Sequence, residues 1–206
     1  MAGQYIRLVI VPPPLPLPGS KDDTRMVEFI IKTAENLPIV KSLTEDPAWA
    51  HNEAYEGFSD EVKPHRLTTG PLGGARALGG FQRVFYNADT EECIIVVFIG
   101  GAVAGWPGVT HGGVIATIMD EALGRVAIRQ LPEHTGVTAN LELNYMKPIV
   151  TNSFYVIRSM PQKEGSTDRK QYVSGRLETL DGNVCVEAKG LFVVPKTFKT
   201  MTIESF

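Results

Sequence analysis

The sequence predicts an α+β fold in which an antiparallel β-sheet wraps one long central helix. From residue 80 onward, short apolar runs of β type alternate with clusters of turn-forming residues. One long segment of helical character, residues 113–130, interrupts these runs after the second of them. The expected order is therefore β-β-α-β-β-β-β, which an antiparallel sheet around a single helix satisfies.

Six strands are expected on the two sides of this helix. Residues 81–86 and 92–99 precede it, and the Asn-Ala-Asp-Thr cluster at residues 87–90 predicts that they form a hairpin. After the helix, the expected strands are residues 136–146, 153–160, 170–179 and 184–194. Turn-forming clusters separate them at residues 147–148, 163–166 and 181–183.

The central helix is apolar on most of its circumference. Its apolar positions are Val114, Ile115, Ile118, Met119, Ala122, Leu123, Val126, Ala127 and Ile128. A helix of this kind is stable only when nearly all of its sides are buried. Enclosure by a sheet provides that burial.

The first 79 residues differ from the rest of the chain. Residues 12–18 hold five prolines and predict an extended arm. Apolar residues recur at helical spacing over residues 23–43, with Asp22 and Asp23 as candidate caps, so we expect one or two helices there. The following segment, up to residue 79, predicts irregular structure. We therefore expect an N-terminal extension at residues 1–79 and the main domain at residues 80–206.

Composition and charge exclude several classes of partner. The net charge of −3 and the lack of a Lys/Arg-rich block leave no basic surface for nucleic acid or an anionic membrane. The apolar run at residues 5–11 is too short for a membrane span or a signal peptide, and Arg7 interrupts it. The four histidines have no metal-ligand spacing, so no metal is expected.

Cysteine usage indicates the compartment. Cys93 and Cys185 lie in apolar runs without C-x-x-C spacing, as buried thiols of a reducing compartment do. We expect a cytoplasmic protein. A mitochondrial location is the alternative, which a single basic residue before Lys21 supports only weakly.

Candidate chemistry gathers at His111-Gly112-Gly113, where the central helix begins. Two glycines let another group approach the backbone closely, and the first-turn N–H groups lack intrahelical partners. This arrangement suits an oxyanion. Asp120 and Glu121 stand in the middle of the same apolar helix, where an unpaired carboxylate costs free energy. We expect one of the two to be there for function.

The spacing along this helix predicts a composite site. Asp120 lies seven residues after Gly113, on the same face but roughly 10 Å away along the axis. A nucleophile and an oxyanion donor must both come within about 3 Å of the reacting atoms. Two antiparallel helices about a twofold axis would bring the glycines of one subunit beside the Asp of the other. We therefore expect a homodimer, with a homotetramer also open.

These motifs resemble a known family. The run from His111 to Asp120 is similar to the HGG-x6-D signature of PaaI-type hotdog thioesterases, and residues 138–148 resemble the strand that follows the central helix in those proteins. The likeness covers residues 80–194 and extends to the long-chain acyl-CoA thioesterase branch that contains the carboxyl-terminal modulator protein. It implies a hotdog fold and hydrolysis of an acyl-CoA thioester to a free acid and CoA.

The resemblance also implies roles for individual residues. Asp120 would act as nucleophile or general base, the Gly112 N–H would polarise the thioester carbonyl, and Thr138 would help to place the attacking water. CoA is part of the substrate, so no separate cofactor is implied. The further substrate-binding candidates are Gly113, Asn144, Lys147, Arg169 and Lys170. Gly105 departs from the pattern, because several relatives carry Asn or Gln six residues before the His.

Each residue also has an ordinary structural interpretation. His111 suits a capping or loop-bracing role better than that of a base. The alternative for Asp120 is a partner of an interface Arg, for Glu121 a solvated or capping carboxylate, and for Thr138 a plain β-branched strand residue. Solvated strand ends are the alternative for the three basic candidates, Lys147, Arg169 and Lys170.

Three other functions stay open. A non-catalytic acyl-CoA or acyl-carrier binding module would keep the glycines but would not need Asp120. A hotdog dehydratase or hydratase would carry a His five residues after the Asp, where this chain has Arg125. A scaffold role could use the first 79 residues.

Overall fold

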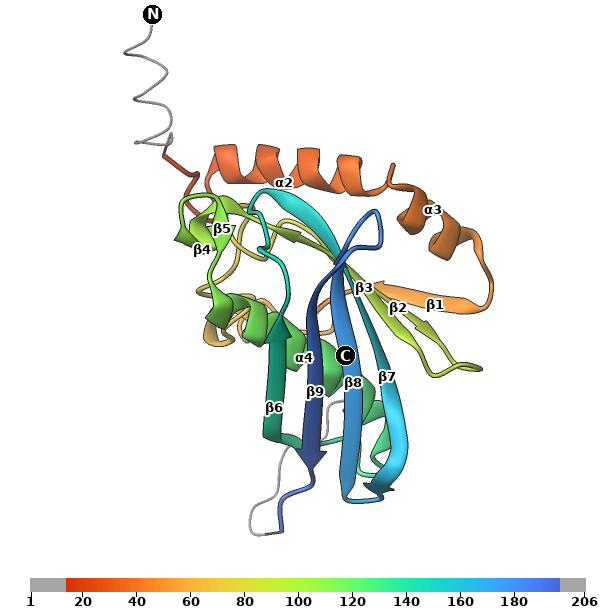
Figure 1. The fold of residues 1–206 in the computed structure, drawn as a ribbon. Coiled ribbons are helices and arrows are strands. Elements are labelled where there is room, and N and C mark those ends of the chain that lie inside the picture. The colour runs from red at the N-terminus through yellow and green to blue at the C-terminus, as the bar shows by residue number, and fades with distance from the viewer. Residues whose placement is uncertain (1–13, 197–206) are drawn as a thin grey trace, which may run out of the picture.

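A computed structural model describes residues 14–196, which form a seven-stranded antiparallel sheet around one long helix (Figure 1). The strand order is β1-β2-β3-β7-β8-β9-β6. These strands are β1 Trp49–Glu53, β2 Gln82–Asn87, β3 Cys93–Ile99, β6 Val137–Tyr145, β7 Ser153–Thr167, β8 Lys170–Thr179 and β9 Val184–Val193. The predicted α+β class, the hairpin and the six strands are confirmed. A small second sheet pairs β4 (Ala104–Trp106) with β5 (Val109–Thr110).

The central helix α4 spans Gly112–Gln130 and packs on the inner face of the sheet, mainly against β7, β8 and β9. Its middle and C-terminal half are almost fully buried, as its apolar circumference predicts. Glycines in the sheet let it approach closely. A side chain at Gly175 would come within 2.8 Å of Leu123 on α4, and one at Gly190 within 3.2 Å of the same leucine.

Two N-terminal helices cover part of the outer face of the sheet. They are α2 (Lys21–Ala34) and α3 (Pro38–Glu45), so two helices form where one or two were expected (Figure 1). A second core fills the space between them and strands β2, β3 and β7; its buried members include Ile30, Ala34, Val40, Phe81, Phe85, Ile94, Val96 and Phe98. Strand β3 is buried on both faces, which explains its unbroken apolar run.

The structure corrects the expected cap of the first helix. Ser20 is the N-cap of α2, and its side chain accepts a hydrogen bond from the Asp23 N–H. Asp23 is buried instead and ties two loops together, because its carboxylate accepts from the N–H groups of Gly19 and Ala75, both at 2.8 Å. The cap predicted at Asp22 or Asp23 is therefore two to three residues too late.

Residues 44–79 are less irregular than expected. They contain β1, which pairs with β2 from Trp49↔Asn87 to Glu53↔Arg83, and a short 3-10 turn, η1 (Lys63–His65). A second 3-10 turn, η2 (Gly101–Val103), precedes β4. The β1 sequence lacks apolar alternation, since it lies at the sheet edge and only some of its side chains are even partly buried.

The ends of the chain lie outside the described residues, and so do the expected apolar run and the first residues of the proline-rich arm. Within residues 14–196, no helix is both long enough and apolar enough to cross a membrane. Cys93 and Cys185 are both free and buried, as predicted.

Candidate functional site

The start of α4 is held by two side chains. His111 is the N-cap residue, and its Nδ1 accepts a hydrogen bond of 2.9 Å from the Gly113 N–H. The Tyr145 hydroxyl, at the end of β6, donates to the Gly112 carbonyl at 2.9 Å. The capping interpretation of His111 thus fits the geometry, and a tyrosine that the sequence did not single out joins the site.

The two glycines of the motif differ in the space that surrounds them. A Cβ at Gly113 would lie 3.1 Å from both Nδ1 and Cε1 of His111, so a larger residue there would push the folded-back imidazole by a few tenths of an ångström. A Cβ at Gly112 would meet only Tyr145, at ordinary distances of 3.6 Å or more. Gly112 is exposed, and no group within residues 14–196 accepts from its N–H. Its backbone can therefore donate to a molecule from outside.

Asp120 is half-buried near the middle of α4 and accepts a 2.8 Å hydrogen bond from the Thr138 hydroxyl on β6. Burial raises the pKa of the Asp120 carboxyl above its ordinary value, and the Thr138 hydrogen bond lowers it in part. A carboxylate with a raised pKa that is still reachable from solvent is suited to act as a base or nucleophile.

Glu121 is placed differently from its neighbour, and the prediction of a solvated or capping carboxylate is wrong. Its carboxylate accepts hydrogen bonds from the hydroxyls of Tyr55 and Thr68. The buried Arg125 guanidinium lies over the Tyr55 ring, 4.7 Å from its centroid. Glu121 therefore fastens the N-terminal extension to α4, and Asp120 is the helix carboxylate left for chemistry.

The lack of a side chain at Gly105 also has a local structural reason. A Cβ at this position would come within 3.1 Å of Cα and Cδ2 of His111. A larger residue would press on the capping imidazole unless the loop shifted. Gly105 thus leaves room for the His111 imidazole in this chain.

The remaining candidates fall into two groups at opposite ends of the sheet. Lys147 follows β6 beside the β8–β9 turn, where its Nζ lies 3.4 Å from the Asn183 side-chain oxygen. Arg169 and Lys170 lie at the start of β8, where the Arg169 guanidinium donates to the Val194 carbonyl at 3.0 Å. Eight residues of β8 separate these ends, a span of roughly 26 Å.

The catalytic candidates also lie at opposite ends of the sheet. Gly112 and Tyr145 lie at the end that carries Lys147, whereas Thr138 pairs with β9 at the end that carries Lys170. Gly112 and Asp120 are eight residues apart on one helix, about 12 Å along its axis. One chain alone therefore does not bring the N–H donor and the carboxylate together.

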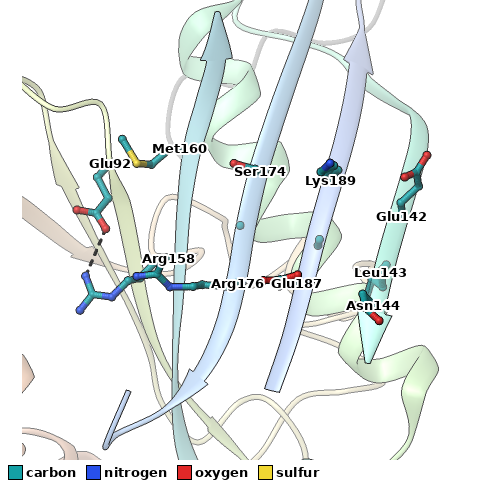
Figure 2. A pocket seen from close by; sticks show the side chains of 12 residues that line it. Glu92, Glu142, Leu143, Asn144, Arg158, Met160, Ser174, Arg176, Glu187 and Lys189 are labelled. Carbon is teal, nitrogen blue, oxygen red and sulfur yellow. Dashed lines mark hydrogen bonds and ion pairs between the residues drawn. The ribbon is translucent and has the colours of Figure 1, made fainter. Parts of the chain in front are cut away.

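Asn144 lies at the Lys147 end of β6 but on the other face of the sheet from α4. It lines a hollow of about 660 Å³ on the outer face of the sheet, opposite α4 (Figure 2). Figure 2 shows the other polar side chains of this hollow, among them Glu92, Glu142, Arg158, Ser174, Arg176, Glu187 and Lys189. Arg158 is already held there, by Glu178 at 2.7 Å and Glu92 at 3.3 Å. The sheet therefore lies between the Asn144 side chain and Asp120 on α4 of the same chain.

The described residues contain no cluster of side chains that would support a metal site. Across the described part of the chain, no three His, Cys, Asp or Glu side chains are close enough together to hold an ion.

Comparison with known proteins points to one family. The model of the Thioesterase superfamily matches residues 107–186, which include His111, Gly112, Asp120 and Thr138. A UPF0644 protein of Schizosaccharomyces pombe is 33% identical over 171 residues, which are 80% of this chain and 64% of that protein. Acyl-coenzyme A thioesterase THEM4 of Mus musculus is 37% identical over 126 residues, 60% of this chain and 52% of that protein.

The chain thus spans less than two thirds of the first relative and about half of the second. Among solved structures, the thioesterase superfamily protein RHA08564 aligns with a TM-score of 0.49 and 21% identity, over 86% of this chain and 97% of that chain.

Proposed function

We propose that the protein hydrolyses acyl-CoA thioesters, on the premise that its residues 107–186 match the model of the Thioesterase superfamily. One observation carries the proposal: the matched region holds a reachable carboxylate of raised pKa and an exposed backbone donor, the Gly112 N–H, for which the described residues supply no acceptor. Similarity to proteins named acyl-coenzyme A thioesterase supports the choice of CoA thioesters.

In the proposed reaction, Asp120 activates the attack on the thioester carbonyl. It either adds to that carbon itself or takes a proton from a water held by Thr138, and both routes need the ionised carboxylate. The Gly112 N–H stabilises the negative charge that develops on the carbonyl oxygen. The carbon–sulfur bond then breaks, CoA leaves as a thiolate that takes up a proton, and water supplies the oxygen of the free acid.

We further propose that the site forms between two subunits of a homodimer. Asp120, Thr138, Arg169 and Lys170 would come from one chain, and Gly112 with its flanking groups from the other. The 12 Å separation along α4 is the physical reason, because both groups must reach one carbon atom. In this arrangement, the basic residues from opposite ends of the sheet contact the same CoA phosphates.

Free-thiol release from a panel of acyl-CoAs tests the function. The panel contains short, medium, long and aromatic acyl groups, and the expected result is saturable hydrolysis of at least one class. Asp120→Ala, measured beside the wild type, excludes a contaminating hydrolase. No release from any member above the Asp120→Ala background would contradict the proposed activity.

The Thr138 hydrogen bond predicts a shift in the pH dependence of hydrolysis. This bond favours the ionised form of Asp120, so its removal raises the carboxyl pKa further. We expect Thr138→Val to lose activity at a higher pH than the wild type as the solution is acidified. Measuring kcat/KM against pH for both proteins shows the displacement of the acid limb.

Thr138→Ser is the matched control, because it keeps the hydroxyl and should restore the wild-type acid limb. Superimposable acid limbs for wild type and Thr138→Val would show that the hydrogen bond does not influence the ionisation of the catalytic group.

We propose a mitochondrial location in place of the cytoplasmic expectation. The printed names of two fungal relatives support it: a Candida albicans protein that is 28% identical is called mitochondrial, and a Saccharomyces cerevisiae protein that is 31% identical is called a mitochondrial membrane protein.

A further inference from the structure

We propose that Tyr145 is a positioning residue that fixes the direction of the oxyanion donor. This inference rests on the proposed thioesterase function, in which the Gly112 N–H is that donor. It adds a residue outside the HGG and Asp motifs, 33 positions along the chain from the glycine that it contacts.

The geometry is that of one peptide held at both of its polar atoms. The carbonyl of the 112–113 peptide accepts from the Tyr145 hydroxyl at 2.9 Å, and its N–H donates to His111 Nδ1 at 2.9 Å. The next N–H toward the N-terminus, that of Gly112, has no acceptor within the described residues. Both hydrogen bonds therefore hold the peptide that immediately follows the one whose N–H is the proposed donor.

Two consecutive glycines at the first turn of the helix are a place where such hydrogen bonds are useful. A Gly-Gly pair has more accessible backbone conformations than any other pair, so its N–H groups point in many directions unless something holds them. Electrostatic stabilisation of a transition state depends on donors that are already oriented. Holding the 112–113 peptide restricts rotation about the Gly112 Cα, and with it the direction of the Gly112 N–H.

Tyr145 itself is anchored on the sheet. Its backbone pairs with Val186 on β9, and the next residue, Met146, donates from its N–H to the Cys185 carbonyl at 2.8 Å. Tyr145 as a residue is 50% exposed, so its hydroxyl adds little to the burial that stabilises the fold. An exposed hydroxyl that bonds a catalytic backbone segment has a role in position more than in stability.

The test is removal of the hydroxyl alone, in Tyr145→Phe. We expect kcat for the best acyl-CoA to fall about tenfold, which corresponds to about 1.4 kcal/mol, while KM changes by less than about twofold. The acid limb of the pH profile should stay in place, because the bond between Thr138 and Asp120 is untouched. Tyr172→Phe is the matched control, since Tyr172 is 39% exposed on β8 and none of the residues 14–196 bonds its hydroxyl.

Two CoA analogues give a readout that a general structural defect would not produce. In a ketone analogue that is fluorinated beside the carbonyl, a methylene group separates the carbonyl from sulfur, and the carbonyl adds water to form a tetrahedral adduct that resembles the transition state and cannot be hydrolysed to products. In an alkyl thioether there is no carbonyl. Tyr145→Phe should bind the ketone several-fold more weakly and the thioether unchanged.

The results of these experiments separate a failure of the positioning role from a failure of the proposed function. Wild-type kcat in Tyr145→Phe, with Asp120→Asn inactive, would overturn the positioning role and leave the proposed function standing. A rise in KM with unchanged kcat, or equal weakening of both analogues, would make Tyr145 a binding residue and also overturn it. If the wild type hydrolyses no acyl-CoA, the proposed function fails and this inference fails with it.

Discussion

Replacing Asp120 by Asn should reduce single-turnover hydrolysis of acyl-CoA by about 10²-fold or more and leave acyl-CoA binding nearly unchanged. The amide keeps the shape of the side chain and can still accept from Thr138, but it can neither attack a thioester nor take a proton from water. In the proposed complex, the CoA phosphates and pantetheine would contact surface groups remote from the reacting carbon. The carboxylate therefore acts mainly in the transition state, and its loss appears in kcat.

The same variant should be more stable than the wild type at neutral pH. Burial raises the folded-state pKa of Asp120 above its unfolded value, so the stability associated with this group is present at low pH and is lost as pH rises through the folded pKa. Asn does not ionise and avoids that loss. The difference in melting temperature should therefore be largest at neutral pH and shrink on acidification.

Glu121→Gln is the matched control, because it makes the same chemical change one residue away. Glu121 accepts from Tyr55 and Thr68, so we expect lower stability and near-normal turnover in this variant. The opposite pattern, with Asp120→Asn active and Glu121→Gln inactive but folded, would transfer the catalytic role to Glu121.

Replacing Gly112 by Pro should abolish turnover to a similar extent, because it deletes the proposed oxyanion donor. The change is compatible with the fold: Gly112 is the first residue of α4, where proline is favoured, and His111 has φ −64° and ψ 133°, a conformation that suits the residue before a proline. Loss of one such donor costs about 10²- to 10³-fold in kcat.

Gly112→Ala separates the N–H from the glycine itself. It keeps the donor, and its Cβ would contact Tyr145 only at ordinary distances, so the folded chain accepts it. We expect Ala to retain far more activity than Pro, with any loss coming from the added methyl group beside the substrate. Equal inactivity of both variants with intact folding would indicate that space, and not the N–H, is what Gly112 provides.

Much of the fold was predictable, because it depends on local patterns. The apolar circumference of α4 and the turn clusters between the strands are visible within short windows of sequence, and both were placed within one or two residues at most boundaries. The C-terminal end of β7 is the largest exception. It continues from the expected residue 160 to Thr167, since its hairpin with β8 closes only at the Thr167↔Lys170 pair.

The catalytic candidates were predictable for a different reason, which is chemical cost. A carboxylate in an apolar helix costs free energy, and so do two glycines at the start of a helix. Both features therefore indicate a functional role without any tertiary information. His111 could be assigned as a cap because Nδ1 reaches the N–H two residues later, which is a local contact.

Other features depended on contacts between distant segments. Glu121 meets Tyr55 and Thr68 across 66 and 53 residues, and nothing local in the sequence distinguishes these hydroxyls from solvated ones. Tyr145 contacts Gly112 through the path of β6 alongside α4. β1 forms by pairing with the edge of β2. The β1 sequence itself therefore shows little of the pattern typical of a strand.

The central claim is that Asp120 of one subunit works on the carbonyl held by Gly112 of the other, and mixing two inactive variants tests it most directly. Asp120→Asn and Gly112→Pro are combined in equal amounts, and subunit exchange is verified by mass. Half of the dimers are then mixed, and each holds one intact site out of two, so about a quarter of wild-type activity should return. Wild type mixed with the Asp120→Asn/Gly112→Pro double variant should instead lose activity in every mixed dimer. No recovery in the first mixture after complete exchange, together with half-active mixed dimers in the second, would place both groups within one subunit and contradict the account.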